Sequence, residues 1–164
     1  MELEYLRMSV FSEVIDKSTV CLNVSVQDSH QLVVTLIEAA ISEGRLAAEH
    51  KDEAVHAVLK REQSASTAMP DGIALPHGRT DCVSEILCIV GIHPQGIAFG
   101  APDNQPSKIF VLLLVPVTVG CNHIHFLANL SRRLMEQSVR EGLLRATSRE
   151  RVIRVLTDQM SDVS

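Results

Sequence analysis

A histidine between a proline and a glycine is the residue of this sequence best placed for chemistry. The segment Gly72-Ile-Ala-Leu-Pro-His-Gly78 is an apolar run that stops at His77. Proline keeps the residue before it extended, and glycine removes side-chain bulk, so we expect the ring to stand exposed in a turn with room for another molecule. Imidazole has an unperturbed pKa of about 6.5 and is largely neutral at pH 7, and a neutral ring nitrogen can attack phosphorus. The alternative is a turn histidine without chemistry.

A phosphoryl group in transfer also needs positively charged hydrogen-bond donors, and Arg61 is the candidate. The planar guanidinium group of arginine can bind two phosphoryl oxygens at once. Arg61 falls in the last turn of an expected helix. The alternative is a solvated cation that interacts favourably with the carboxyl end of that helix.

The segment Cys121-Asn-His-Ile-His125 resembles a metal-ligand cluster, but its spacing does not suit one ion. Residues two apart on a helix point to nearly opposite sides, so His123 and His125 cannot easily share a metal. We therefore expect no metal here. A histidine in the first turn behind an Asn122 cap lies instead beside free backbone N–H groups, which bind anions. This favours His123 as a neighbour of the phosphoryl group.

The remaining histidines and the cysteines indicate no further site. His93 precedes a proline in an expected turn. Three others lie on or near polar helix faces, where we expect them to be solvated: His30, His50 and His56. The cysteines lack any CxxC spacing, so neither a disulfide framework nor a zinc ribbon is expected: Cys21, Cys82, Cys88 and Cys121. A glycine-rich nucleotide-binding motif is also missing from the sequence.

Hydrophobic periodicity predicts the elements that must position these side chains. Strands are expected at residues 20–26, 73–75, 86–92 and 109–115, and residues 64–72 are expected to form a loop. Helices are expected at residues 29–43, after an Asp28 cap, at 51–62 and at 149–158. A further helix is expected to begin after Asn122, with Ile124, Leu127, Leu130 and Leu134 on one face. Strands that alternate with helices predict an α/β layer structure with helices on the faces of the sheet.

Length and composition place the chain among single globular domains. It has 164 residues, 46% of them hydrophobic, and we expect one domain over residues 1–164 with a frayed end at 161–164. The formal net charge of −5 argues against nucleic acid as a partner. The longest apolar run, Ile109 to Val117, is far shorter than the roughly 20 residues of a membrane helix. The acidic start, Met1-Glu-Leu-Glu, is unlike a secretory signal and favours a cytoplasmic location.

Several motifs in order resemble one known family, the fructose/mannitol-type enzyme IIA domains of the bacterial phosphotransferase system, and within it the nitrogen-regulatory branch. The motifs are Arg61-Glu62, Ser66-Thr67, Gly72-Ile-Ala-Leu-Pro-His-Gly-Arg79, Gly96-Ile-Ala-Phe-Gly-Ala-Pro-Asp-Asn-Gln-Pro106, Leu113-Leu-Val-Pro116 and His123-Ile-His-Phe-Leu-Ala128. One departure is the run Ser66-Thr-Ala-Met-Pro70, where the family has a glycine-rich run.

The resemblance implies a fold, a reaction and partners. The fold would be a mixed sheet flanked by helices. His77 would take the phosphoryl group, with Arg61 and His123 in the site; His123 rather than His125 fits the family pattern because Leu127 and Ala128 follow it at the family spacing. The donor would be the phosphocarrier HPr or its nitrogen-branch counterpart, and no cofactor would be needed.

The resemblance leaves the role after phosphorylation open. A nitrogen-type regulator of another protein is favoured by the segment Asp103-Asn-Gln-Pro106. The alternatives are a sugar-transport IIA component that passes phosphate to a cysteine of a IIB domain, and a binding module of the same fold that is not phosphorylated.

Overall fold

The computed structural model describes residues 1–118, 120 and 122–158, without the side chain of Asn122. The helices are α1 (Glu2–Asp16), α2 (Ser29–Ser42), the short 3-10 helix η1 (Ala48–His50), α3 (Lys51–Ser64), α4 (Asn122–Met135), α5 (Gln137–Arg145) and α6 (Arg149–Thr157). The strands are β1 (Thr19–Cys21), β2 (Ala68–Met69), β3 (Ile73–Ala74), β4 (His77–Thr80), β5 (Leu87–Ile97) and β6 (Ser107–Pro116). The expected frayed end and the Asn122 side-chain cap lie outside the described residues.

The described strands form one mixed sheet, which confirms the predicted fold class. Its order is β1-β5-β6-β3-β2, and β4 also pairs with β6. Strands β3 and β4 both run parallel to β6 and follow each other along the same edge of it, whereas β5 is antiparallel to β6. The register places His77 opposite Leu113.

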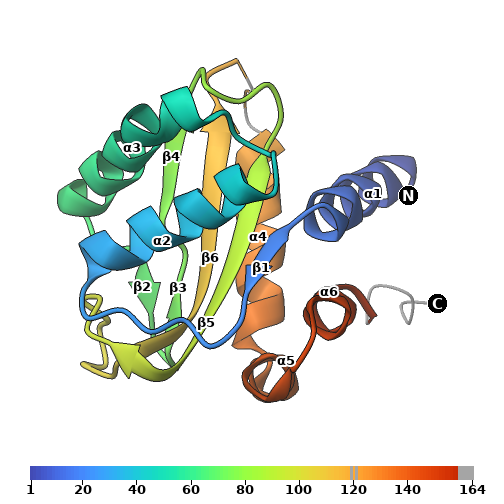
Figure 1. Cartoon of the computed structure of the whole chain (residues 1–164). Coiled ribbons are helices and arrows are strands. Elements are labelled where there is room, and N and C mark those ends of the chain that lie inside the picture. The colour runs from blue at the N-terminus through green and yellow to red at the C-terminus, as the bar shows by residue number, and fades with distance from the viewer. Residues whose placement is uncertain (119, 121, 159–164) are drawn as a thin grey trace.

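Strand β6 is buried on both faces, as its apolar sequence predicts. Alternate residues of β6 belong to two separate cores. Phe110, Leu112 and Leu114 pack with α2 and α3, and Ile109, Val111, Leu113 and Val115 pack with α1, α4, α5 and α6. Helices therefore cover both faces of the sheet, as Figure 1 shows.

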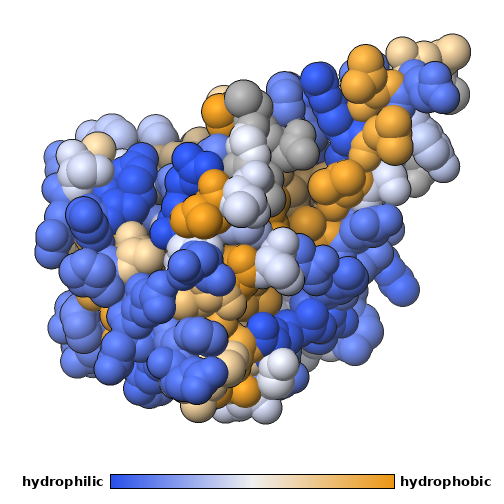
Figure 2. All heavy atoms as spheres, turned by 90° about the horizontal axis from the view of Figure 1, so that it is seen from above, coloured by the Kyte–Doolittle hydropathy of each residue, from blue (hydrophilic) through white to orange (hydrophobic). Residues whose placement is uncertain are grey.

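Several elements differ from the prediction because they are short or lack a clear apolar stripe. The strand expected at residues 20–26 has only three residues, the loop at 64–72 contains β2, and α1, α5 and β4 were not predicted. In α1 only Phe11 and Ile15 are buried, while other large apolar residues face solvent along the projecting helix (Figure 2). Such a helix gives a weak periodic signal.

His93 was expected in a turn and lies instead in β5, where it is buried. Its Nε2–H donates to the Val26 carbonyl oxygen at 2.9 Å, and its Nδ1 accepts from the Gly96 N–H at 3.0 Å. Both ring nitrogens are therefore used in holding the loop before α2 against the end of β5, which is a structural role.

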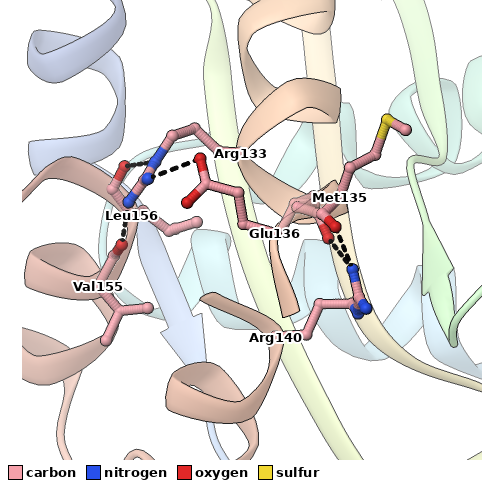
Figure 3. Close-up of polar contacts among 7 residues, drawn as sticks. Arg133, Met135, Glu136, Arg140, Val155 and Leu156 are labelled. Carbon is pink, nitrogen blue, oxygen red and sulfur yellow. Dashed lines mark hydrogen bonds and ion pairs between the residues drawn. The ribbon is translucent and has the colours of Figure 1, made fainter. Parts of the chain in front are cut away.

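Two arginines join the helices on the α4 side of the sheet (Figure 3). Arg133 is buried and donates to the carbonyl oxygens of Val155 and Leu156 at the end of α6. Arg140 donates to the carbonyl oxygens of Leu134 and Met135 at the end of α4. These bonds satisfy carbonyls that have no partner inside their own helices, so they fix α4, the helix that begins beside His123.

Among the described residues, no helix is long and apolar enough to cross a membrane.

Candidate phosphoryl-transfer site

The candidate site begins with an unusually close contact between α3 and β4. A Cβ atom on Gly78 would lie 2.7 Å from the carbonyl carbon of Ala57 and 2.8 Å from the amide nitrogen of Val58. Only glycine allows the two backbones to approach so closely. This corrects the expectation that Gly78 makes room for an incoming molecule: it makes room for α3, whose last turn carries Arg61.

His77 stands at the first position of β4 and is half-buried, so the predicted exposed turn is wrong. Proline has no N–H, and Pro76 separates the short strands β3 and β4. The carbonyl oxygen of Leu75 lies 2.8 Å from Nδ1 of His77. Because a carbonyl only accepts, Nδ1 carries the proton and the neutral ring keeps its lone pair on Nε2.

The surroundings of His77 keep its ring neutral. Burial lowers the pKa of His77 below its usual value, and the positive charges of Arg61 and His123 lower it further. The Leu75 carbonyl and the Glu62 carboxylate act in the opposite direction, but the net pKa is lowered. A neutral imidazole with a free Nε2 is the nucleophilic form.

Arg61 lies near enough for its charge to act on His77, and it also caps its own helix. Its Nη1 donates to the Ala65 carbonyl oxygen at 2.9 Å and contacts the Ser64 hydroxyl at 3.5 Å. Arg61 can therefore both cap the carboxyl end of α3 and interact with a phosphoryl group at His77. The cap fixes the guanidinium group, and a fixed cation is a better electrostatic partner for an anion than a mobile one.

Glu62 is a residue near His77 to which the sequence analysis gave no role. Its carboxylate accepts from the backbone N–H of Thr67 at 2.8 Å and from the Thr67 hydroxyl. These bonds tie the loop after α3 to the end of that helix, and this loop leads into β2, which precedes β3 and the strand that carries His77. Residues 66–70, which differ from the glycine-rich run of the family, are therefore ordered. Ala68 and Met69 in this run form β2 and pair with β3.

His123 lies in the first turn of α4 and is held like His77. Its Nδ1 donates to the Gly120 carbonyl oxygen at 2.8 Å, which leaves Nε2 for another group. His125 and Ile124 are exposed, and the core face of α4 is formed by Phe126, Leu130 and Leu134. The prediction of Ile124 on the buried face is wrong, because the buried positions follow a register set by Phe126.

Arg61 and His123 thus both lie close enough to His77 for their charges to lower its pKa. A cavity of about 340 Å³ lies elsewhere, between residues 14–17, 44–45 and the turn at 82–88, and none of the three lines it. The described residues contain one group of potential metal ligands, and it includes neither His77 nor His123.

The mixed sheet with helices on both faces and a histidine beside an arginine define a protein of the enzyme IIA class. Residues 13–159 match the family described as "Phosphoenolpyruvate-dependent sugar phosphotransferase system, EIIA 2", and the chain belongs to this family. It is thus a phosphotransferase-system component.

Relatives with two kinds of name are similar to the chain. The "PTS system fructose-specific EIIA component" of Haloferax volcanii is 39% identical over 123 residues, which are 75% of this chain and 79% of that protein. The "Nitrogen regulatory protein" of Escherichia coli (strain K12) is 37% identical over 105 residues, which are 62% of this chain and 63% of that protein. The chain therefore spans slightly less than two thirds of the second relative.

Solved structures give the same picture of the fold. The nitrogen regulatory protein IIA-Ntr from Neisseria meningitidis superposes with a TM-score of 0.79 at 25% identity, covering 90% of this chain and 99% of that one. The IIA mannitol structure from Escherichia coli superposes with a TM-score of 0.70 at 23% identity, covering 84% and 95%.

Proposed function

We propose that this protein accepts a phosphoryl group on Nε2 of His77 from HPr or an HPr-like carrier, and that it acts in the cytoplasm as a nitrogen-type regulator. The observation that carries the proposal is the fixed ring of His77: Nδ1 is bonded to the Leu75 carbonyl, so the neutral ring presents a free Nε2 beside Arg61. In the transfer, the bond from Nε2 to phosphorus forms while the bond from phosphorus to the donor breaks. Arg61 stabilises the negative oxygens, and His123 does so in its protonated form, in which Nε2 also carries a proton that it can donate.

The surface next to His123 supports a protein, rather than a metabolite, as the donor. Val117, in the turn that follows β6, is 51% exposed, and Ile124, in the first turn of α4, is 56% exposed. Exposed apolar side chains beside a charged site suit a docking surface with an apolar centre and a polar rim.

The regulatory role is supported by the nitrogen-regulatory relatives and by the segment Asp103–Pro106. In this segment Asp103 accepts from the Asp71 N–H at 3.0 Å and from the Gln105 N–H at 3.1 Å, which joins two loops. The fructose-specific relative favours the alternative, in which the phosphoryl group passes to a IIB cysteine. One solved complex contains the mannitol IIA enzyme with phosphorylated IIB, and the chain shares its fold.

The proposal is tested by incubating the chain with enzyme I, labelled phosphoenolpyruvate and either HPr or its nitrogen-branch counterpart, followed by added membranes and sugars. We expect label on the wild type, none on His77→Ala, and no phosphorylated sugar. Phosphorylation of a sugar would instead support the alternative that the chain is a sugar-transport IIA component. A chain that no carrier labels would be the third alternative, a binding module of the same fold.

A further inference from the structure

A group of metal-ligating side chains lies at the other end of the α3–β4 contact. His50 ends η1 directly before α3, Glu53 is in the first turn of α3, and Cys82 follows β4. One ligand atom from each residue lies within 4.8 Å of those of the other two. We propose that His50, Glu53 and Cys82 bind one zinc ion, with water as a fourth ligand.

The distances are close to those of a loaded site. Zinc takes nitrogen, oxygen and thiolate ligands in a tetrahedron with bonds of about 2.0–2.3 Å, so its ligand atoms stand about 3.3–3.7 Å apart. The three ligand atoms need to approach one another by up to about 1.5 Å, which rotations of the side chains supply. The mixed set of imidazole, carboxylate and thiolate favours zinc over magnesium or calcium, which prefer oxygen alone.

A buried hydroxyl group already orients two of the three ligands. Thr80 is buried on the face of β4 toward α3. Its hydroxyl donates to Oε1 of Glu53 at 3.3 Å and accepts from the backbone N–H of Cys82 at 3.1 Å. Such contacts behind the ligands fix their orientation before a metal arrives.

The charges around the group favour a cation. Glu49 Oε1 lies 3.8 Å from Nε2 of His50, and the carboxylates of Glu53 and Asp81 both act on the Cys82 thiol. The adjacent cation, Lys51, is paired with Glu38. Glu53 is exposed, so an ion can enter from solvent, and on binding the thiol proton of Cys82 leaves to solvent as the sulfur–zinc bond forms.

The zinc site is separate from the phosphoryl-transfer site. Glu53 and Arg61 are eight residues apart in α3, which is roughly 12 Å along the helix axis. An ion here would join the start of α3 to the end of β4, and thus brace the pair of elements that carries Arg61 and His77. We expect zinc to raise the thermal unfolding midpoint of the protein without being needed for phosphorylation.

The test titrates Co²⁺, and then Zn²⁺ in competition, into the reduced, metal-free full chain while the thiolate-to-cobalt absorption band is recorded. We expect one Co²⁺ per chain, a band that Zn²⁺ abolishes, and release of protons. Cys82→Ser should lose the band, and the matched thiol control Cys21→Ser should keep it. His50 is half-exposed, so His50→Gln should fold normally. Loss of a residue that only hydrogen-bonds to a metal ligand weakens binding by roughly 10- to 100-fold, and loss of the ligand His50 itself should weaken zinc binding by more than that.

Two further variants separate the zinc site from other metal binding. His56→Gln, on the exposed face of α3, and His77→Ala should both bind zinc like the wild type. The proposal is overturned if the band is absent, if it survives in Cys82→Ser, or if His77→Ala loses zinc binding as fully as His50→Gln does. Circular dichroism of each variant shows that the fold is retained.

Discussion

A proline and a backbone carbonyl set the chemistry of His77. Pro76 separates β3 from β4, and the Leu75 carbonyl oxygen binds Nδ1 of the ring. The same carbonyl cannot also bind Nε2, so the nucleophilic nitrogen is selected by the backbone alone. His123 is held in the same way by the Gly120 carbonyl oxygen.

Replacing Arg61 by alanine separates its two roles. We expect phosphoryl transfer to slow by on the order of 10²-fold, because one fixed donor to the developing charge is lost. Loss of the bond to Ala65 should cost only about 1 kcal/mol of folding free energy. Transfer rates and denaturant unfolding of the same variant measure both effects, and Arg45→Ala is a control at an exposed arginine outside the site. An unchanged rate would leave Arg61 with its capping role alone.

The lowered pKa of His77 predicts a particular pH dependence of stability. The unfolded chain takes up this proton at a pH of about 6.5, before the folded chain does. The unfolded state therefore binds more protons as the pH falls below about 6.5, and stability decreases until the folded pKa is passed. In His77→Gln this contribution should vanish. Unfolding free energies of both proteins between pH 7.5 and about pH 5 check the sign: a wild type that gains stability over the variant on acidification would contradict it.

At the scale of elements, the register of α4 decides which histidine belongs to the site. His123 is half-buried and fixed to the turn before the helix, whereas His125 is exposed. We expect His123→Ala to slow transfer or to shorten the lifetime of the phosphohistidine, and His125→Ala to have much less effect. Rates of label uptake and loss for the two variants distinguish them, and the reverse order would refute the role given to His123.

Contact between α3 and β4 depends on Gly78. A methyl group there would clash with the backbone of Ala57 and Val58, which cannot move as a flexible side chain can. We expect Gly78→Ala to destabilise the fold by about 1–3 kcal/mol, as overpacking does, and to slow transfer by moving Arg61 away from His77. Gly44→Ala is a comparison that measures backbone strain without a clash, since Gly44 has open space around it but a positive φ that Gly78 lacks. Wild-type stability of Gly78→Ala would show that the contact is not needed.

At the scale of the whole molecule, the sequence predicted best those elements whose side chains follow one clear period. The helix at 29–43 with its Asp28 cap, the helix that carries Arg61 and the central strand at 109–115 agree with the structure. Helix α1 was missed because its apolar residues do not gather on one face. The strand expected at residues 20–26 was predicted too long, because an alternating pattern does not show where pairing with β5 ends.

The candidate site could be predicted only in part, for a physical reason. Arg61, His77 and His123 are side chains in recognisable motifs, whereas the Leu75 carbonyl and the Glu62 charge act through the folded arrangement. The zinc ligands were missed in the same way. His50 and Glu53 are three residues apart, but Cys82 comes from a distant segment, and a search for local spacing cannot join them.

The most direct test of the account is the position of phosphorus on the phosphorylated protein. The chain, labelled through enzyme I and its carrier, is examined by ³¹P NMR under native and denaturing conditions, with His77→Ala as the control. The account predicts a single phosphohistidine linked through Nε2, which is missing from His77→Ala. Phosphorus on Nδ1 of His77, or a signal that persists in the variant at another histidine, would contradict it.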